Sequence, residues 1–121
     1  MTKNSICSWS GGKDSCFALM QAIELGYNPK VLLNVLNEEG RISRSHGIPY
    51  SILQTQANVA GFHLHCISSS WEEYEMHFTN ALQELKDGFK ISHAIFGDID
   101  LQGIVLFSKT LAAAMFCCIM I

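Results

Sequence analysis

The sequence has few of the features that mark disordered, fibrous or secreted chains. Only 2 of its 121 residues are proline and 9 are glycine, so collagen-like repeats and low-complexity linkers are excluded as the main state. Charged residues make up 16% and hydrophobic residues 49%, which predicts a single domain with a buried core. The start, MTKNSICSWSGG, has no long apolar run before a cleavage site, so a cytoplasmic location is expected.

An excess of positive charge is also absent. Eight Lys+Arg against 11 Asp+Glu give a formal net charge of −3. A chain without a general basic surface is poorly suited to hold a phosphate backbone, so no nucleic-acid partner is expected. A local basic patch stays open.

The five cysteines form no C-x-x-C pair, which argues against a disulfide framework and a tetrahedral zinc site. We expect reduced and mostly buried thiols. His63, His65 and Cys66 are the local group most suited to a metal, because alternate residues of a strand share a face. Spacing identifies no third ligand, so no metal site is predicted.

Short apolar runs alternate with helical patterns along most of the chain. Strands are expected at residues 5–9, 31–36, 62–68 and 93–99. Helical spacing of apolar residues covers 14–26 and 49–61, each closed by a glycine, and a third helix is expected after a capping box of Ser70 and Glu73. Trp71, Tyr74 and Phe78 begin its apolar stripe. This α/β alternation predicts an open, doubly wound parallel sheet.

The segment SGGKDS, residues 10–15, joins the first expected strand to a helix N-terminus, where unpaired N–H groups and the helix dipole favour an anion. Two glycines allow close backbone approach, two hydroxyls can donate hydrogen bonds, and a lysine adds positive charge. These features predict a phosphate-binding loop. Its members are Ser10, Gly11, Gly12, Lys13, Asp14 and Ser15.

Two alternatives stay open for this loop. Asp14 is expected either to cap the helix or to help hold a metal ion. The whole segment can also be read as a helix-capping Gly-Gly turn. It is not a Walker A loop, which needs G-x-x-x-x-G-K-[ST].

Further candidate residues follow from the rule that ligands bind at the carboxyl ends of parallel strands. Asn34 lies near the end of the second strand, and Gly97 and Asp98 close the fourth. Asp98 is expected to be functional, because a carboxylate at that edge faces the crevice. His46 is expected either to orient adenylate or substrate, or to cap the next helix. For Trp9, core packing and an adenine-side wall both stay open.

At this point the chain resembles a known family. SGGKDS resembles the signature of the PP-loop ATP pyrophosphatases, which cleave ATP between its α and β phosphates and adenylate a substrate. The segments RISRSHGIPYSILQTQA, WEEYE and FGDIDLQ, in this order, are similar to the branch that contains diphthine–ammonia ligase. The resemblance runs from about Asn4 to Gln102 and implies a Rossmann-like, adenine nucleotide alpha hydrolase-like fold.

The resemblance implies an ATP-dependent ligase that forms amides with ATP and Mg²⁺. A carboxylate acceptor would attack the α-phosphate, releasing pyrophosphate, and ammonia would then displace AMP. The acceptor would be diphthine on elongation factor 2 or a small molecule. The catalytic residues implied are Lys13, Asp14, His46 and Asp98, and the nucleotide-binding residues are 10–15 with Asn34 and Gly97.

Two other functions remain as alternatives to the ligase. One is a nucleotide-binding module without turnover, and the other is a tRNA-modifying PP-loop adenylating enzyme. The acidic balance and the missing C-x-x-C pairs disfavour the second. An oligomer is compatible with each of these three functions.

The family pattern stops near Gly103. We therefore divide the chain into a PP-loop ATP-binding domain, residues 1–103, and an atypical apolar tail, residues 104–121, in place of the family's C-terminal part. The apolar run at 111–121 is shorter than the roughly 20 residues a bilayer span needs, so no membrane partner is expected. We expect a reading-frame change or premature stop, leaving ATP binding without full activity. A buried fifth element is the alternative.

Overall fold

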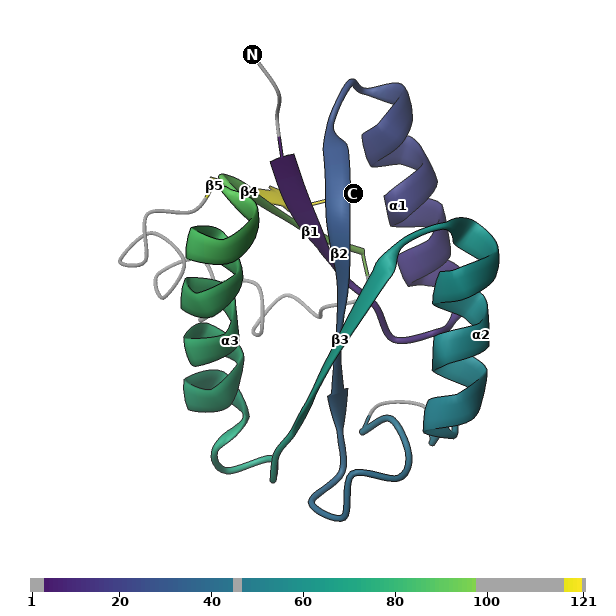
Figure 1. Ribbon diagram of the computed structural model, residues 1–121, viewed down its shortest axis with the longest axis vertical. Coiled ribbons are helices and arrows are strands. Elements are labelled where there is room, and N and C mark those ends of the chain that lie inside the picture. Colours follow the sequence, from purple (N-terminus) through teal and green to yellow (C-terminus); the bar gives the residue numbers. More distant parts are fainter. Residues whose placement is uncertain (1–3, 45–46, 98–116, 121) are drawn as a thin grey trace.

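A parallel sheet with helices on both faces forms the structure, a computed structural model that describes residues 4–44, 47–97 and 117–120 (Figure 1). The strands are β1 (Asn4–Ser8), β2 (Asn28–Leu36), β3 (His63–Ser68), β4 (His93–Phe96) and β5 (Cys117–Met120), in the spatial order β3-β2-β1-β4-β5. The helices are α1 (Lys13–Glu24), α2 (Tyr50–Ala60) and α3 (Tyr74–Phe89). Every strand pair is parallel, so the predicted α/β fold is confirmed.

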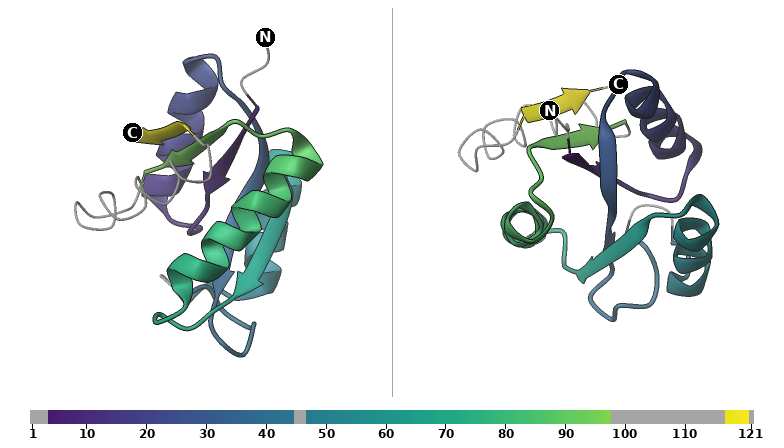
Figure 2. Two further views of the ribbon diagram at one scale, coloured as in Figure 1. Left: turned by 90° about the vertical axis from the view of Figure 1, so that its left-hand side faces the viewer. Right: turned by 45° about the horizontal axis from the view of Figure 1, so that its top comes forward.

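The sheet is doubly wound, because α1 and α2 cover one face and α3 covers the other (Figure 2). The interior strand β2, between β3 and β1, is apolar along most of its length and has alternate residues in two cores. Val31 and Leu33 face the core beneath α3, whereas Leu32 and Leu36 face the core beneath α1 and α2. A strand with both faces covered needs this continuous apolar run.

Helix α3 begins later than the sequence suggests. The N–H of Glu73 donates to Ser70 Oγ at 3.2 Å, but the helix starts at Tyr74 and no side chain caps it. Trp71 therefore precedes the helix and is 61% exposed, so its predicted place in the buried stripe is wrong. The stripe proper consists of Phe78, Ala81, Leu82 and Leu85.

Helix α1 is apolar nearly all round in the sequence, but the structure buries only its inner side. Phe17, Met20 and Ile23 are exposed there. The inner residues, Ala18, Leu19 and Ala22, pack on the sheet. A helix that packs on one face of a sheet buries only one of its sides. Because apolar residues lie on all sides of α1, the sequence does not show which side that is.

The fifth strand lies in the segment expected to be an atypical tail. β5 pairs in parallel with β4, from His93 opposite Cys117 to Phe96 opposite Met120. This strand adds a fifth member to the parallel sheet, while the division of the chain at Gly103 stays a prediction. In the part of the chain that the structure describes, no helix is both long and apolar enough to cross a membrane.

Candidate functional site

The strand order reverses beside β1, which places a site there. The chain runs outward from β1 through β2 to β3 and then returns to β4 on the other side of β1. In open parallel sheets, ligands bind at such a switch point, beyond the carboxyl ends of the strands. The segment between β1 and α1 begins at this switch point, and Gly97 directly follows the neighbouring strand β4.

Within this segment, two serine hydroxyls pair with each other. Ser10 Oγ lies 3.1 Å from Ser15 Oγ, and Ser15 Oγ donates to the Gly12 carbonyl at 3.1 Å. Ser10 Oγ in turn accepts the N–H of Gly12 at 3.3 Å. Both serines are buried. The loop is therefore closed by its own hydroxyls, at the end of α1 whose first N–H groups have no partner within the helix.

Lys13 and Asp14 lie exposed in the first turn of α1. The helix is capped by the backbone of Gly12, with no side-chain cap hydrogen bond, so the capping alternative for Asp14 is wrong. A lysine and a carboxylate thus stand at the mouth of the loop, where each is open to a ligand from solvent.

Residues distant in sequence fix the loop from outside. Asn34 Nδ2 donates to the Trp9 carbonyl at 2.6 Å, from a side chain only 3% exposed. Trp9 Nε1 donates to Gln56 Oε1 at 3.0 Å, and Gln56 Nε2 donates to the Gly11 carbonyl at 3.3 Å. Trp9 is buried in the core under α1 and α2, which supports core packing of its two interpretations.

Two glycines let neighbouring elements approach the loop closely. Gly11 has a φ of +87°, and a Cβ there would lie 2.6 Å from Ile48 Cδ1. At Gly97, a Cβ would lie 2.4 Å from Ala18 Cβ and 2.7 Å from the Asp14 carbonyl oxygen. Because neither position has room for a side chain, the loop and the start of α1 are held between α2 and the end of β4.

A comparison with protein families gives a match over the part of the chain that contains this loop. A family model described as the diphthamide synthase N-terminal domain matches residues 3–104. The chain belongs to the diphthamide synthase N-terminal domain family. This family is a PP-loop family, and the matched range contains the loop at residues 10–15. The comparison with curated proteins found no match.

The predicted site residues of this diphthamide synthase-type domain fall into three groups. Ser10, Gly11, Gly12 and Ser15 form the loop, with Lys13 and Asp14 at its mouth. Gly97 packs against α1, and Asn34 holds the Trp9 carbonyl from inside the sheet, so both support the loop from behind. His46 and Asp98 lie outside the described residues, and their roles stay predictions.

Gln56 is a contact residue of the loop that sequence reasoning did not place there. In the sequence it is one of the helically spaced residues of α2 and part of the segment RISRSHGIPYSILQTQA that carries the family resemblance, but neither feature predicts its contact with the loop. An isolated glutamine among apolar positions at the inner side of a helix is a usable signal, because a half-buried amide needs hydrogen-bond partners.

A second cluster of polar and aromatic side chains lies after β3 in the diphthamide synthase-type domain. His77 Nδ1 is 2.7 Å from the buried Ser69 Oγ, and His77 Nε2 is 3.9 Å from Glu73. Trp71 stacks with Tyr74 at 5.4 Å between ring centroids. Arg44 forms an ion pair with Glu38, and its guanidinium carbon lies 5.4 Å from the centroid of the Trp71 ring.

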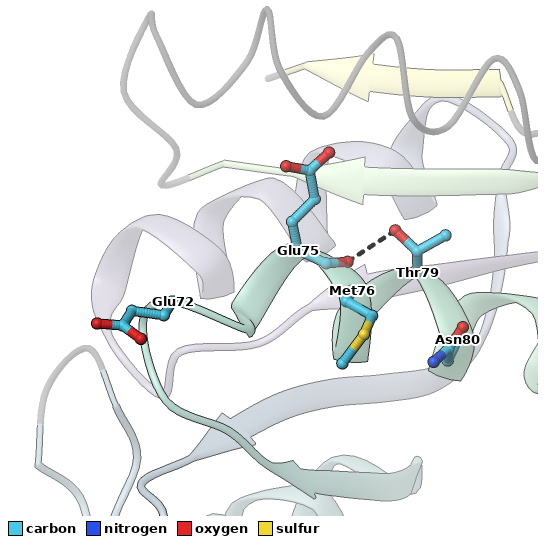
Figure 3. A pocket seen from close by; sticks show the side chains of 5 residues that line it. All are labelled: Glu72, Glu75, Met76, Thr79 and Asn80. Carbon is cyan, nitrogen blue, oxygen red and sulfur yellow. Dashed lines mark hydrogen bonds between the residues drawn. The ribbon is translucent and has the colours of Figure 1, made fainter.

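Along α3, a hollow of about 430 Å³ is lined by Glu72, Glu75, Met76, Thr79 and Asn80 (Figure 3). Thr79 Oγ1 donates to the Glu75 carbonyl at 2.8 Å and so bonds to its own helix. The lining residues of the hollow belong to α3 and the segment directly before it, and α3 covers the face of the sheet opposite α1 and α2 (Figure 2). The hollow is therefore separate from the loop at residues 10–15.

The histidines of β3 do not form a metal centre. Among the described residues, no group of three His, Cys, Asp or Glu side chains is placed to hold a metal ion. Burial lowers the pKa of His65, as does the neighbouring His63, and Glu84 opposes this shift. Burial raises the pKa of the Cys66 thiol to about 11, which makes it unreactive. Of the other two cysteines whose side chains the structure describes, Cys7 is buried and Cys16 is exposed.

Proposed function

We propose that this domain binds ATP with its β and γ phosphates in the loop at residues 10–15. The observation that carries the proposal is the preformed loop at the switch point, with buried hydroxyls, a lysine at its mouth and neighbouring elements packed closely against Gly11 and Gly97. Oriented N–H groups and a nearby cation bind phosphate without reorganisation, and this favours an anion over the solvent it displaces.

The residues present fit a magnesium nucleotide. Asp14 offers an exposed carboxylate beside the loop, and Mg²⁺ commonly takes one or two carboxylates together with substrate phosphates. Bound there, the ion would offset phosphate charge. Lys13 and the N–H groups of the first turn of α1 would stabilise the negative charge on departing pyrophosphate.

The reaction we propose is formation of an amide from a carboxylate and ammonia. A carboxylate oxygen bonds to the α-phosphorus as the bond to pyrophosphate breaks, giving an acyl-adenylate. Ammonia then attacks the acyl carbon, AMP leaves with the bonding pair, and one proton passes to water. Membership of a diphthamide synthase domain family supports diphthine on elongation factor 2 as the acceptor. A small carboxylic acid is the alternative acceptor.

Exchange of labelled pyrophosphate into ATP tests the adenylation step. We expect exchange that depends on an added carboxylate acceptor, and AMP release when ammonia is also present. Tight ATP binding without exchange for any acceptor would reduce the function to a nucleotide-binding module. Exchange that depended on tRNA would instead indicate a tRNA-modifying enzyme.

Paired substitutions locate the phosphate site. Lys13→Ala and Asp14→Ala should each weaken ATP binding about tenfold, as expected for loss of one charge-assisted contact. The matched controls are Lys30→Ala in β2 and Asp87→Ala in α3, which change exposed residues outside the loop. Unchanged ATP affinity in both loop variants would exclude this loop as the phosphate site.

A further inference from the structure

We infer that Gln56 is a positioning residue that orients the Gly11–Gly12 peptide of the loop toward phosphate. The inference rests on the proposed function. Gln56 comes from α2, yet its amide contacts the residues on both sides of Ser10. Through Oε1 it accepts from Trp9, and through Nε2 it donates to Gly11, so one planar group fixes two points of the loop.

The Gln56 bond to Gly11 determines where the next N–H points. In a trans peptide, the C=O and the following N–H lie in one plane and point in opposite directions. Gln56 draws the Gly11 carbonyl toward α2 at 3.3 Å. The N–H of Gly12 is thereby turned away from α2, toward Ser10 Oγ at 3.3 Å, on the side where the loop closes. Without Gln56, this flexible Gly-Gly peptide can rotate, and its donor leaves the phosphate site.

The close approach of α2 makes the contact specific to this position. A Cβ at Gly11 would lie 3.2 Å from Gln56 Oε1 and 3.1 Å from Leu53 Cδ2. A side chain at residue 11 would therefore crowd this amide and the neighbouring Leu53. An amide is also the needed group, since it supplies a donor and an acceptor together. A carboxylate supplies acceptors only, and a thioether supplies neither in useful strength.

The positioning role of Gln56 predicts different effects on the phosphate part and on the adenosine part of ATP. Gln56 touches the part of the loop proposed to hold the β and γ phosphates, so its loss should weaken ligands that carry them. Adenosine has no phosphate and should be unaffected. A purely structural role would weaken adenosine and ATP alike, because unfolding or loosening of α2 would disturb the whole site.

The test compares Gln56→Met, Gln56→Glu and the control Gln54→Met by calorimetric titration with magnesium ATP, pyrophosphate and adenosine. Gln54 is on the same helix, but its side chain bonds only to Tyr50 and Asn58, within α2. We expect Gln56→Met to weaken ATP and pyrophosphate about tenfold, as for one or two lost hydrogen bonds. Gln56→Glu should weaken them further, because a carboxylate then faces the Gly11 carbonyl. Gln54→Met should change neither.

The titrations distinguish a failure of the positioning role of Gln56 from a failure of the proposed function. Unchanged ATP affinity in both Gln56 variants, or an equal loss for adenosine and ATP, would overturn the positioning role while leaving the proposed function intact. If Gln56→Met fails to fold, the isosteric Gln56→Glu gives the answer. Failure of the unsubstituted protein to bind ATP or pyrophosphate would overturn the proposed function, and this inference with it.

Discussion

The loop after β1 and the loop after β3 both lie at the carboxyl ends of the parallel strands, but they are held in place in different ways. The loop after β1 is fixed by residues far away in sequence: Asn34, Gln56 and the close packing at Gly97. The loop after β3 is fixed mainly by its neighbours, through Ser70 to Glu73, Ser69 to His77 and Trp71 to Tyr74. Its long-range contacts are Arg44 over the Trp71 ring and the Ser69 N–H, which donates to the Leu36 carbonyl at 3.1 Å.

The difference shows which loop is built before any ligand arrives. Contacts from separate elements hold a loop only when the whole sheet has formed, and they then hold it rigidly. Local contacts, several of them exposed, break at little cost. Preorganised donors are what phosphate binding needs, so the loop after β1 is suited to it and the loop after β3 is suited to adjust.

The largest effect should come from filling the space at Gly11. Gly11→Ala combines a positive φ with a methyl group 2.6 Å from Ile48 Cδ1, and should lower the free energy of unfolding by roughly 2–4 kcal/mol. Gly26→Ala is the matched control, because its φ is +92° but no described atom lies within 4 Å of the new Cβ. Urea denaturation measures both. Equal losses would show that packing against α2 does not constrain the loop.

Asn34→Ala should come next. It removes the hydrogen bond from a buried amide to the Trp9 carbonyl and should cost about 1–3 kcal/mol of unfolding free energy. Asn58→Ala in α2 is the control, since Asn58 is exposed and bonds only to Gln54 within its own helix. A loss at Asn34 no larger than at Asn58 would contradict a fixed loop after β1.

A smaller effect is expected in the loop after β3. His77→Ala removes one hydrogen bond to Ser69 from a partly exposed ring, and should cost about 0.5–1.5 kcal/mol. Asn80→Ala, exposed on the same helix, controls for the change of helix propensity. If His77→Ala destabilised the protein more than Asn34→Ala, the contrast between the two loops would be reversed.

The smallest effect concerns the strand that leads to this second loop. Burial keeps the pKa of His65 below its ordinary value of 6.5, so near and below that pH the unfolded chain binds more protons than the folded one. Stability should therefore be retained above pH 6.5 and fall as the pH drops toward the folded pKa. Thermal unfolding of His65→Asn should show a weaker fall over this range. Glu84→Gln should show a steeper one, because Glu84 raises this pKa. An identical pH profile for all three proteins would remove His65 from this account.

The fold was predictable from the sequence because its signals are local. The continuous apolar run of β2, the glycine ends of the first two helices and the SGGKDS turn each depend on adjacent residues. Boundaries were less secure, as α3 shows. The Glu73 N–H does donate to Ser70 Oγ, but the helix starts only at Tyr74, because one local hydrogen bond does not fix where helical backbone begins.

The site was predictable only in part. The loop residues were predicted from their chemistry, and the structure brings them together. Asn34 holds the Trp9 carbonyl, a contact that only the pairing of β1 with β2 reveals. Gln56 is 45 residues from Gly11, and no spacing rule joins them. His77 follows Glu73 by four residues, a spacing visible in the sequence, but its bond to Ser69 depends on how α3 folds back.

The central proposal is that the loop after β1, and not the loop after β3, binds phosphate. Two-dimensional NMR spectra of the backbone amides during a pyrophosphate titration test it most directly. The account predicts that the largest shifts occur at residues 10–15, with Gly12 prominent, while Ser69, Ser70 and Glu73 change little. Shifts centred on the loop after β3, or none at Gly12, would contradict it.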